Sequence, residues 1–233
     1  MAFTTLTPPA EALDPSLLGF EISAGRSILS HDPCDDLTSW HAQLYVPGWL
    51  AGEVWPDLFP PERNFNREAP DGVEPGRIAD QIVATARVCT LNLYQQTRLA
   101  EILDCDSADL GEFIRLVDGH GLTDELEDSI EGFGTKLVIL DRVTVSPLWR
   151  GHRLGPLVAA LALDTVGADA HLFACYPGAV ELEHGTSERE ASDLRLVELW
   201  TKFGFTIADD PLLLADPAVT DWGAVVRELF GEE

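Results

Sequence analysis

The sequence predicts a mixed α/β fold in which helices flank a central mixed sheet, and three observations lead to it. Residues 38–46 alternate apolar and polar side chains, which is the period-two spacing of a strand with one face in the core. Residues 137–145 are apolar and β-branched, as in a largely buried strand, and residues 154–166 carry apolar side chains at helical spacing. Because residues 170–176 form another short apolar run, a strand–helix–strand unit with parallel strands is expected.

The first half of the chain contains less regular segments. Residues 1–35 are rich in Pro, Ser, Asp and Thr and are predicted to form an N-terminal extension with one short strand near residues 20–22. Residues 52–76 contain several prolines among acidic residues, which favours an irregular loop. Residues 81–94 are rich in Val, Thr, Leu and Ala and predict a strand antiparallel to the strand at residues 38–46.

A helical insertion is predicted between that strand and the central strand. Apolar side chains at helical spacing indicate three short helices. These helices are expected near residues 97–103, over residues 107–119 with Gly119 closing the helix, and over residues 123–130.

The C-terminal part is predicted to complete the sheet. Ser187 and Glu190 have the spacing of a capping box and indicate the start of a helix that ends at Gly204. Two short apolar runs predict closing strands, and a last amphipathic helix is expected to pack on the sheet. These three segments are residues 205–208, 212–215 and 222–229.

The composition predicts a single acidic domain over residues 36–233. With 233 residues, 45% of them hydrophobic, the chain can bury a sizeable core. Its 40 acidic and 15 basic residues give a formal charge of −25, which argues against nucleic acid or an anionic membrane as a partner.

The sequence also gives an expectation for the location of the protein. No apolar run is long enough to span a bilayer. The four cysteines suggest neither a zinc site nor disulfides, so a cytoplasmic protein without a metal is expected. The sequence makes no prediction of oligomeric state.

One stretch, residues 136–155, departs from this acidic average. It holds four basic residues, one acidic residue and a histidine: Lys136, Arg142, Arg150, Arg153, Asp141 and His152. Most of the remaining chain repels a polyanion, so a polyanion is expected to bind here. The stretch ends at the start of a predicted helix, whose first amides have no acceptor within the helix and favour a phosphate.

Two motifs in this part of the chain resemble the GNAT acetyltransferase superfamily. Its pyrophosphate loop reads Gln/Arg-x-x-Gly-x-Gly/Ala after a strand that ends in Val-x-Val, and the fitting residues are Arg150, Gly155, Val143 and Val145. Arg153 stands where the loop has its middle glycine. Residues 199–205, Leu-Trp-Thr-Lys-Phe-Gly-Phe, are similar to the superfamily's Leu-Tyr-x-Lys-Leu-Gly-Phe. The resemblance covers residues 136–208 and implies a GNAT-like sheet, with the helical insertion before its central strand.

The resemblance also implies a function, an N-acyltransferase that uses acetyl-CoA or another acyl-CoA as co-substrate and needs no metal. The main chain of Val143, Thr144 and Val145 is implied to bind the pantetheine arm as an added strand. The loop implied to hold the pyrophosphate consists of Arg150, Gly151, His152, Arg153, Leu154, Gly155 and Pro156. The acceptor is expected to be a cationic amine, because the surrounding surface is acidic, and it is either a small molecule or a protein N-terminus or lysine.

Acyl transfer from a thioester to an amine needs a base for the ammonium and an acid for the departing thiolate. The superfamily's usual acid, the Tyr of the second motif, is Trp200 here, which has no proton of suitable pKa. Asp141 on the central strand is the predicted base, and the alternative is that it pairs with a nearby arginine. Tyr176 is the predicted substitute acid, and the alternative is a packing role. Trp200 and Arg153 leave a second function open, a catalytically degenerate relative that binds CoA or a protein partner without turnover.

Overall fold

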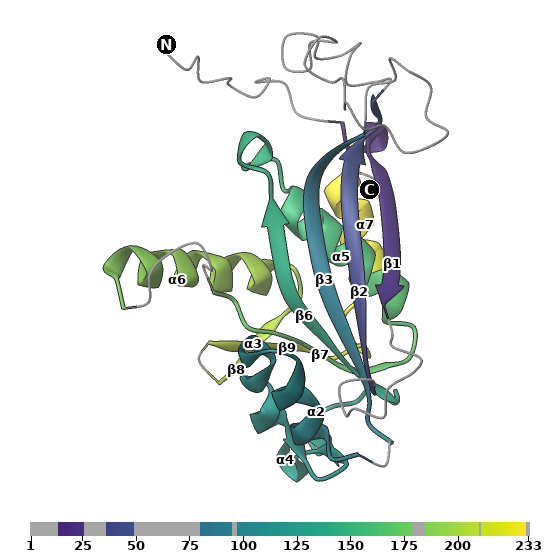
Figure 1. The fold of residues 1–233 in the computed structure, drawn as a ribbon, viewed down its shortest axis with the longest axis vertical. Helices are drawn as coiled ribbons and strands as arrows, with labels where there is room; N and C mark the ends of the chain where they lie inside the picture. The colour runs from purple at the N-terminus through teal and green to yellow at the C-terminus, as the bar shows by residue number, and fades with distance from the viewer. Residues whose placement is uncertain are drawn as a thin grey trace.

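The computed structural model describes residues 14–25, 36–48, 80–94, 97–178, 185–209 and 211–231, so the loop predicted over residues 52–76 lies outside the described residues. A large, mostly antiparallel seven-stranded sheet is flanked by helices (Figure 1), which confirms the predicted mixed α/β class. The order of its strands is β1-β2-β3-β6-β7-β9-β8. The strands are β1 (Gly19–Gly25), β2 (Leu37–Val46), β3 (Gln81–Asn92), β6 (Lys136–Val145), β7 (Ala170–Cys175), β8 (Thr206–Asp209) and β9 (Leu212–Ala215), and β4 (Val117–Asp118) and β5 (Gly121–Leu122) form a separate ribbon.

The pairing of the strands follows the sequence pattern closely. Strands β1, β2, β3 and β6 pair antiparallel in that order. The antiparallel pairing of β2 with β3 confirms the prediction for residues 38–46 and 81–94. Strands β6 and β7 are parallel, which confirms the predicted strand–helix–strand unit. Since β1 pairs with β2 along its whole length, the sheet already begins within the segment predicted as an N-terminal extension.

The helices differ from the prediction mainly in the insertion. They are α2 (Leu99–Asp106), α3 (Ala108–Gly111), α4 (Asp124–Glu127), α5 (Leu154–Val166), α6 (Ser187–Lys202) and α7 (Trp222–Phe230), with 3-10 turns η1 (Pro15–Leu17), η3 (Ile114–Leu116) and η4 (Pro147–Trp149). The helix predicted over residues 107–119 was wrong beyond Gly111, because the chain continues through η3 into the β4–β5 ribbon. Gly119 has φ +63 and belongs to the turn of that ribbon, where a left-handed residue suits a hairpin. None of the described helices has the length and hydropathy needed to cross a bilayer.

The start of α6 is displaced by one residue from the predicted capping box. Thr186, not Ser187, is the capping residue, and its Oγ1 accepts a hydrogen bond from the N–H of Arg189 at 3.2 Å. Both residues are hydroxyl-bearing, so the sequence pattern alone does not distinguish them.

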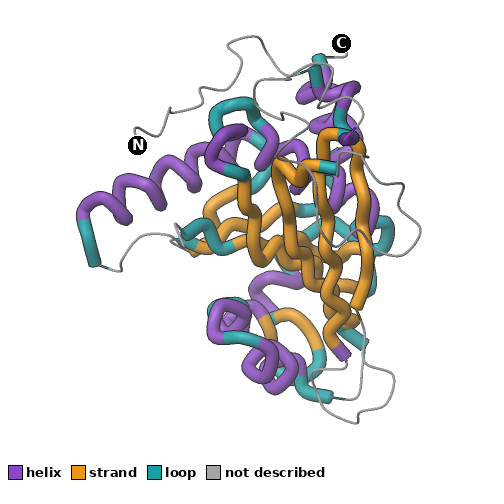
Figure 2. Tube along the Cα trace, turned by 45° about the horizontal axis from the view of Figure 1, so that its top comes forward, coloured by secondary structure: helices purple, strands orange, loops and turns teal. Residues whose placement is uncertain are grey.

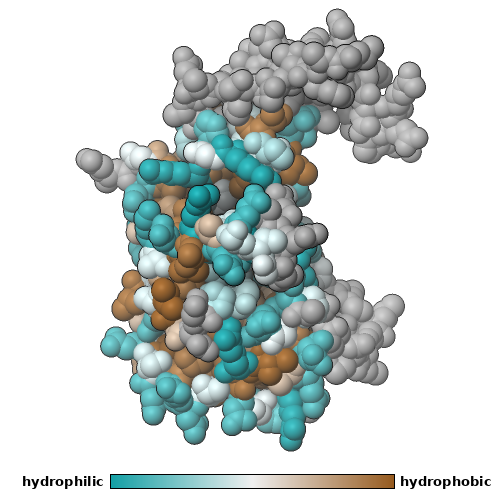
Figure 3. Space-filling view, turned by 90° about the vertical axis from the view of Figure 1, so that its left-hand side faces the viewer, coloured by the Kyte–Doolittle hydropathy of each residue, from teal (hydrophilic) through white to brown (hydrophobic). Residues whose placement is uncertain are grey.

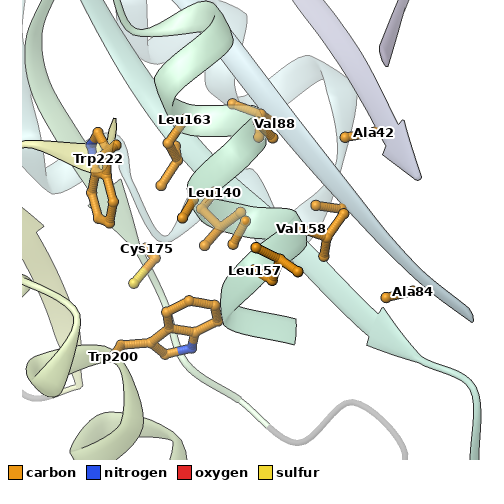
Figure 4. Packing of buried hydrophobic residues seen from close by; sticks show 14 of the residues in the cluster. Ala42, Ala84, Val88, Leu140, Leu157, Val158, Leu163, Cys175, Trp200 and Trp222 are labelled. Atoms are coloured by element: carbon orange, nitrogen blue, oxygen red, sulfur yellow. The ribbon is translucent and has the colours of Figure 1, made fainter. Parts of the chain in front are cut away.

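Helices α5 and α7 cover one face of the sheet. Figure 4 shows Leu157, Val158 and Leu163 of α5 directed toward strand residues such as Val88 and Leu140, and all of these side chains belong to one buried cluster. Helix α5 is apolar on nearly all sides because it is enclosed between the sheet, α7 and the end of α6. The start of α5 is therefore held firmly against the end of β6.

The described helices cover only part of the opposite face. A second cluster joins side chains of α2, α3 and η3 to the first half of β6, for example Leu103 and Phe113 to Leu137 and Ile139. Figure 2 shows these helices grouped at one end of the strands, and in Figure 1 none of the described helices lies in front of β1, β2 and β3. The area over which no described helix lies is made of β1, β2, β3 and the second half of β6, and it is called the open face below.

Candidate functional site

Strands β6 and β7 run side by side over only half of β6. Their parallel register begins at Lys136 and Ala170 and ends at Leu140 and Cys175, and beyond Leu140 the described partner of β6 is β3 alone. Figure 1 shows β6 leaving β7 on the side from which α6 projects, and Figure 3 shows separate hydrophobic patches among hydrophilic side chains on that side. Among the described residues, the second half of β6 therefore has an edge that pairs with no strand, and this edge is called the opening below.

The two predicted catalytic residues both lie where this opening begins. Asp141 follows Leu140 on β6 and Tyr176 follows Cys175 at the end of β7, so each is the first residue beyond the last parallel pair. Leu140 and Cys175 face the α5 side, and Tyr176 packs against the cluster on the other side of the sheet. The strand register therefore brings together two residues that are 35 positions apart in the sequence.

Three residues of β6 were predicted to bind the pantetheine arm through their main chain, and two of them face this opening. The N–H of Ser146 donates to the carbonyl of Val83 at 2.9 Å, so Ser146 and every second residue before it face β3. Val143 and Val145 consequently direct their N–H and C=O groups to the side of the opening. The carbonyl of Val145 accepts from Nε of Arg150 at 3.2 Å, which agrees with this direction. Thr144 is different, because its peptide groups face β3.

A short loop connects β6 to α5. The buried indole of Trp149 anchors the loop, and the N–H of Trp149 donates to the carbonyl of Ser146 at 2.8 Å. Gly151 has φ +87 with open space beside its α-carbon, and Arg153 has φ +58. A left-handed conformation strains a residue other than glycine by about 1–2 kcal/mol, so the geometry at Arg153 gives a physical reason for the glycine of the resembled motif.

The start of α5 presents main-chain donors. Its N-cap residue Arg153 makes no side-chain capping bond, whereas the N-caps of α6 and α7, Thr186 and Asp221, do. The first turn offers the N–H groups of Leu154 and Gly155, while Pro156 has no N–H and can only shape the turn. With the side chains of Arg150, His152 and Arg153 in the same loop, these donors form a region suited to an anion.

Gly155 contributes close packing as well as an amide. It is buried, and a Cβ added to it would lie 3.4 Å from Cγ2 of Val145 and 3.5 Å from Cγ1 of Val143. Its hydrogen therefore faces β6, and glycine lets the first turn of α5 approach that strand. A large side chain at Gly155 would disturb the contact between helix and strand, so a test of anion binding has to be made at another residue of the loop.

Asp141 occupies a β-bulge. Arg142 pairs with Arg87 and Leu140 pairs with Val88, so Asp141 is the extra residue of β6. Its side chain is only 1% exposed, and Oδ2 accepts from Nη1 of Arg87 at 3.2 Å. Pairing with an arginine, the alternative considered from the sequence, is thus present in the structure. The predicted base role remains a prediction and requires that the carboxylate act from within this ion pair.

Tyr176 is half-buried, and its surroundings favour the neutral phenol. Burial raises the pKa of Tyr176, the negative charges of Glu112 and Asp193 raise it further, and Arg115 and Arg189 act in the opposite direction. Because an ordinary tyrosine titrates near pH 10, the hydroxyl keeps its proton throughout the neutral range. Tyr176 can therefore donate a proton or a hydrogen bond at neutral pH.

Trp200 is part of the hydrophobic core. It is buried, its ring lies 6.2 Å from that of Phe205 in an edge-to-face arrangement, and Figure 4 shows it beside Leu157 and Cys175. The residue that corresponds to the tyrosine of the resembled motif thus supports the start of α5 through packing.

Arg87 is the residue of this site that the sequence analysis missed. Strand alternation alone puts it on the polar side of β3, but the bulge that brings it to Asp141 has no recognisable pattern in the sequence.

Neither a known family model nor a curated protein matches this chain. Any function must therefore be argued from the opening, the loop and the helix start themselves.

Proposed function

We propose that the protein is a coenzyme A-dependent N-acyltransferase, with an acetyl group as the expected acyl group and an amine as the acceptor. The observation that carries this proposal is the opening along β6, which leads directly to the uncapped start of α5. The peptide groups of Val143 and Val145 can bind an extended arm containing amides, in the manner of an added strand. The arginines and amides at the end of the same strand suit the pyrophosphate at the other end of that arm.

The two motifs that resemble the GNAT superfamily add support, because one of them is the loop between β6 and α5. The order of the parts also fits an acyl-CoA. The strand edge that would receive the arm ends at the anion-binding loop, and Asp141 and Tyr176 lie at the opposite end of the edge. Reacting groups and phosphate-binding groups are thus separated along one strand.

The proposed chemistry needs three proton transfers. Asp141 is the proposed base that removes one proton from the ammonium of the acceptor, after which the amine nitrogen attacks the thioester carbon. The carbon–sulfur bond then breaks, and Tyr176 is the proposed donor of the proton to the departing sulfur. The nitrogen releases its second proton, which restores Tyr176 through solvent. One ammonium and one thioester thus give one amide, one thiol and the proton that Asp141 passes to solvent.

A second candidate is a protein that binds acyl-CoA without turnover, and two observations favour it. Trp200 is buried in the core, and Asp141 is engaged with Arg87. Thiol release from acetyl-CoA, measured above its hydrolysis with a panel of amines, separates the two candidates. CoA binding without thiol release on any amine favours the second candidate, and no measurable CoA affinity contradicts both.

The CoA site can be tested at Arg153. We expect Arg153→Glu to weaken CoA binding by about ten-fold or more, equivalent to about 1.4 kcal/mol, because a carboxylate replaces a guanidinium beside the proposed pyrophosphate position. Arg153→Gly should keep its affinity within about three-fold, since glycine accepts the φ of +58 and leaves the main-chain donors in place. Isothermal titration calorimetry with CoA measures both variants.

The matched control is Arg227→Glu. Arg227 is an exposed arginine of α7, and its reversal changes the net charge of the protein by the same amount as Arg153→Glu. Equal CoA affinity for Arg153→Glu and Arg227→Glu would show that the loop is not the cofactor site.

A further inference from the structure

The open face of the sheet carries a hollow of about 410 Å³ whose walls come from β1, β2, β3 and β6. The strands that line it form the open face, which is turned toward the viewer in Figure 1, opposite to α5 and α7. Most of the residues that line it have polar or charged side chains, among them Glu21, His41, Gln43, Thr85, Arg87 and Arg142. The hollow adjoins the proposed acyl-transfer site, because Arg87 contacts both the hollow and Asp141.

The strand register aligns basic side chains across this hollow. Ser23 pairs with His41, His41 with Arg87, and Arg87 with Arg142, so one row crosses four strands. Like charges directly opposite each other on neighbouring strands destabilise a sheet. Two arginines in this arrangement stand out in a chain with 15 basic residues and a net charge of −25. Two neighbouring guanidinium groups on one face are an arrangement that can bind an anion.

The two arginines are held by different partners. Arg87 donates to Asp141 and, through Nη2, to Oγ of Ser39 at 3.2 Å, which fixes its position. Arg142 donates from Nη2 to Oδ2 of Asp109 at 2.8 Å, but the two side chains are 51% and 60% exposed. An exposed ion pair of this kind stabilises a protein by only about 0–1 kcal/mol. A guanidinium has five N–H donors, so Arg142 can bind a further carboxylate beside Asp109.

The surroundings disfavour an anion with more than one charge. Three carboxylates lie at or near the hollow, those of Glu21, Asp109 and Asp141, and their repulsion grows with the charge of the ligand. A carboxylate carries one negative charge and matches the fork of a guanidinium, whereas a phosphate carries nearly two. The carboxylate of Glu21, which accepts a hydrogen bond of 3.0 Å from Nε2 of Gln43, lies on β1, the lining strand farthest from β6.

We propose that this hollow binds a carboxylate of the acceptor, so that the acceptor is an amino acid or a similar small molecule with both an amine and a carboxylate. This inference rests on the proposed acyltransferase function. Neighbouring strands lie about 4.8 Å apart, so a carboxylate over β3 and β6 leaves the amine of a small molecule within reach of the opening beside β6. The acidic surface of the protein attracts the ammonium group, and the arginine pair selects the acceptors that also carry an acid.

The test compares pairs of amines that differ only in whether they carry a carboxylate or a neutral carboxamide. β-Alanine, γ-aminobutyrate and lysine are each compared with their carboxamides in the thiol-release assay with acetyl-CoA, and their binding without acetyl-CoA is followed by NMR titration. We expect the wild type to favour at least one of the acids over its amide by about ten-fold or more in kcat/KM. Arg142→Gln should lose most of this preference, measured as the ratio of kcat/KM for acid and amide within the same variant. Arg227→Gln, the same substitution at a distant exposed ion pair, should keep the preference.

The outcomes separate this inference from the function on which it rests. Thiol release at equal rates with acids and amides would leave acyl transfer intact and overturn the carboxylate site. A preference for acids that survives Arg142→Gln would also overturn it. Binding of an acid that depends on Arg142, without any thiol release, would support the carboxylate site and contradict the acyltransferase. If there is neither release nor preferential binding, both proposals fail.

Discussion

Replacing Asp141 with Asn is expected to reduce turnover by about 100-fold or more while CoA affinity changes by less than about two-fold. The proposed base would lose its ability to accept a proton, whereas the loop and the start of α5, at the other end of the β6 edge, would keep their contacts. The measurements are single-turnover rates with acetyl-CoA and calorimetric CoA affinities. Wild-type turnover in Asp141→Asn would return Asp141 to a structural role.

The ion pair with Arg87 demands a control, because Asp141→Asn also removes the charged partner of a partly buried guanidinium. We expect a loss of about 1–3 kcal/mol in the free energy of unfolding for Asp141→Asn, and a smaller loss when Arg87→Gln is added. Arg87→Gln alone should keep more turnover than Asp141→Asn, because it retains the carboxylate. The two single variants and the double variant are compared. If their turnover changes only in proportion to the folded fraction of each, the ion pair acts on stability alone.

The fold was predictable wherever one local pattern decides one element. Strand β2 follows from its period-two alternation, and α5 follows from its apolar spacing, which stops just before its C-cap, Gly167. The parallel pairing of β6 and β7 follows from the length of the connection between them. The ribbon β4–β5 was missed, because its four residues pair through a turn at Gly119 and carry too short a pattern to compete with the helical spacing around them.

The candidate site was predictable only in part, because its position depends on where the pairing of β6 with β7 stops. The sequence named Asp141 and Tyr176 separately, yet nothing in either segment shows that the parallel register ends at Leu140 and Cys175. The bulge at Asp141 is likewise a property of two strands, and it decides that Asp141 meets Arg87. The hollow on the open face is still less visible, since it combines residues of four strands that only the registers align.

Tyr176→Phe is expected to lower turnover by about 100-fold or more and to leave CoA affinity within about two-fold of the wild type. Phenylalanine keeps the ring that packs against the cluster of α2, α3 and η3 and removes only the hydroxyl. The pKa of Tyr176 is raised by burial and by Glu112, so the loss of its proton should not limit the rate below about pH 10. The pH profile of kcat should consequently show no decline that depends on Tyr176 between pH 7 and about pH 10.

Glu112→Gln tests whether Tyr176 is the acid, because it removes a negative charge that raises the pKa of the phenol. The alkaline limb of the kcat profile should move to lower pH in this variant, and it should be absent from the residual activity of Tyr176→Phe. The matched control is Tyr94→Phe, since Tyr94 is 77% exposed at the end of β3 and is expected to show wild-type turnover. If Tyr176→Phe keeps wild-type turnover, or if the alkaline limb is the same with and without the phenol, Tyr176 is a packing residue and another group protonates the thiolate.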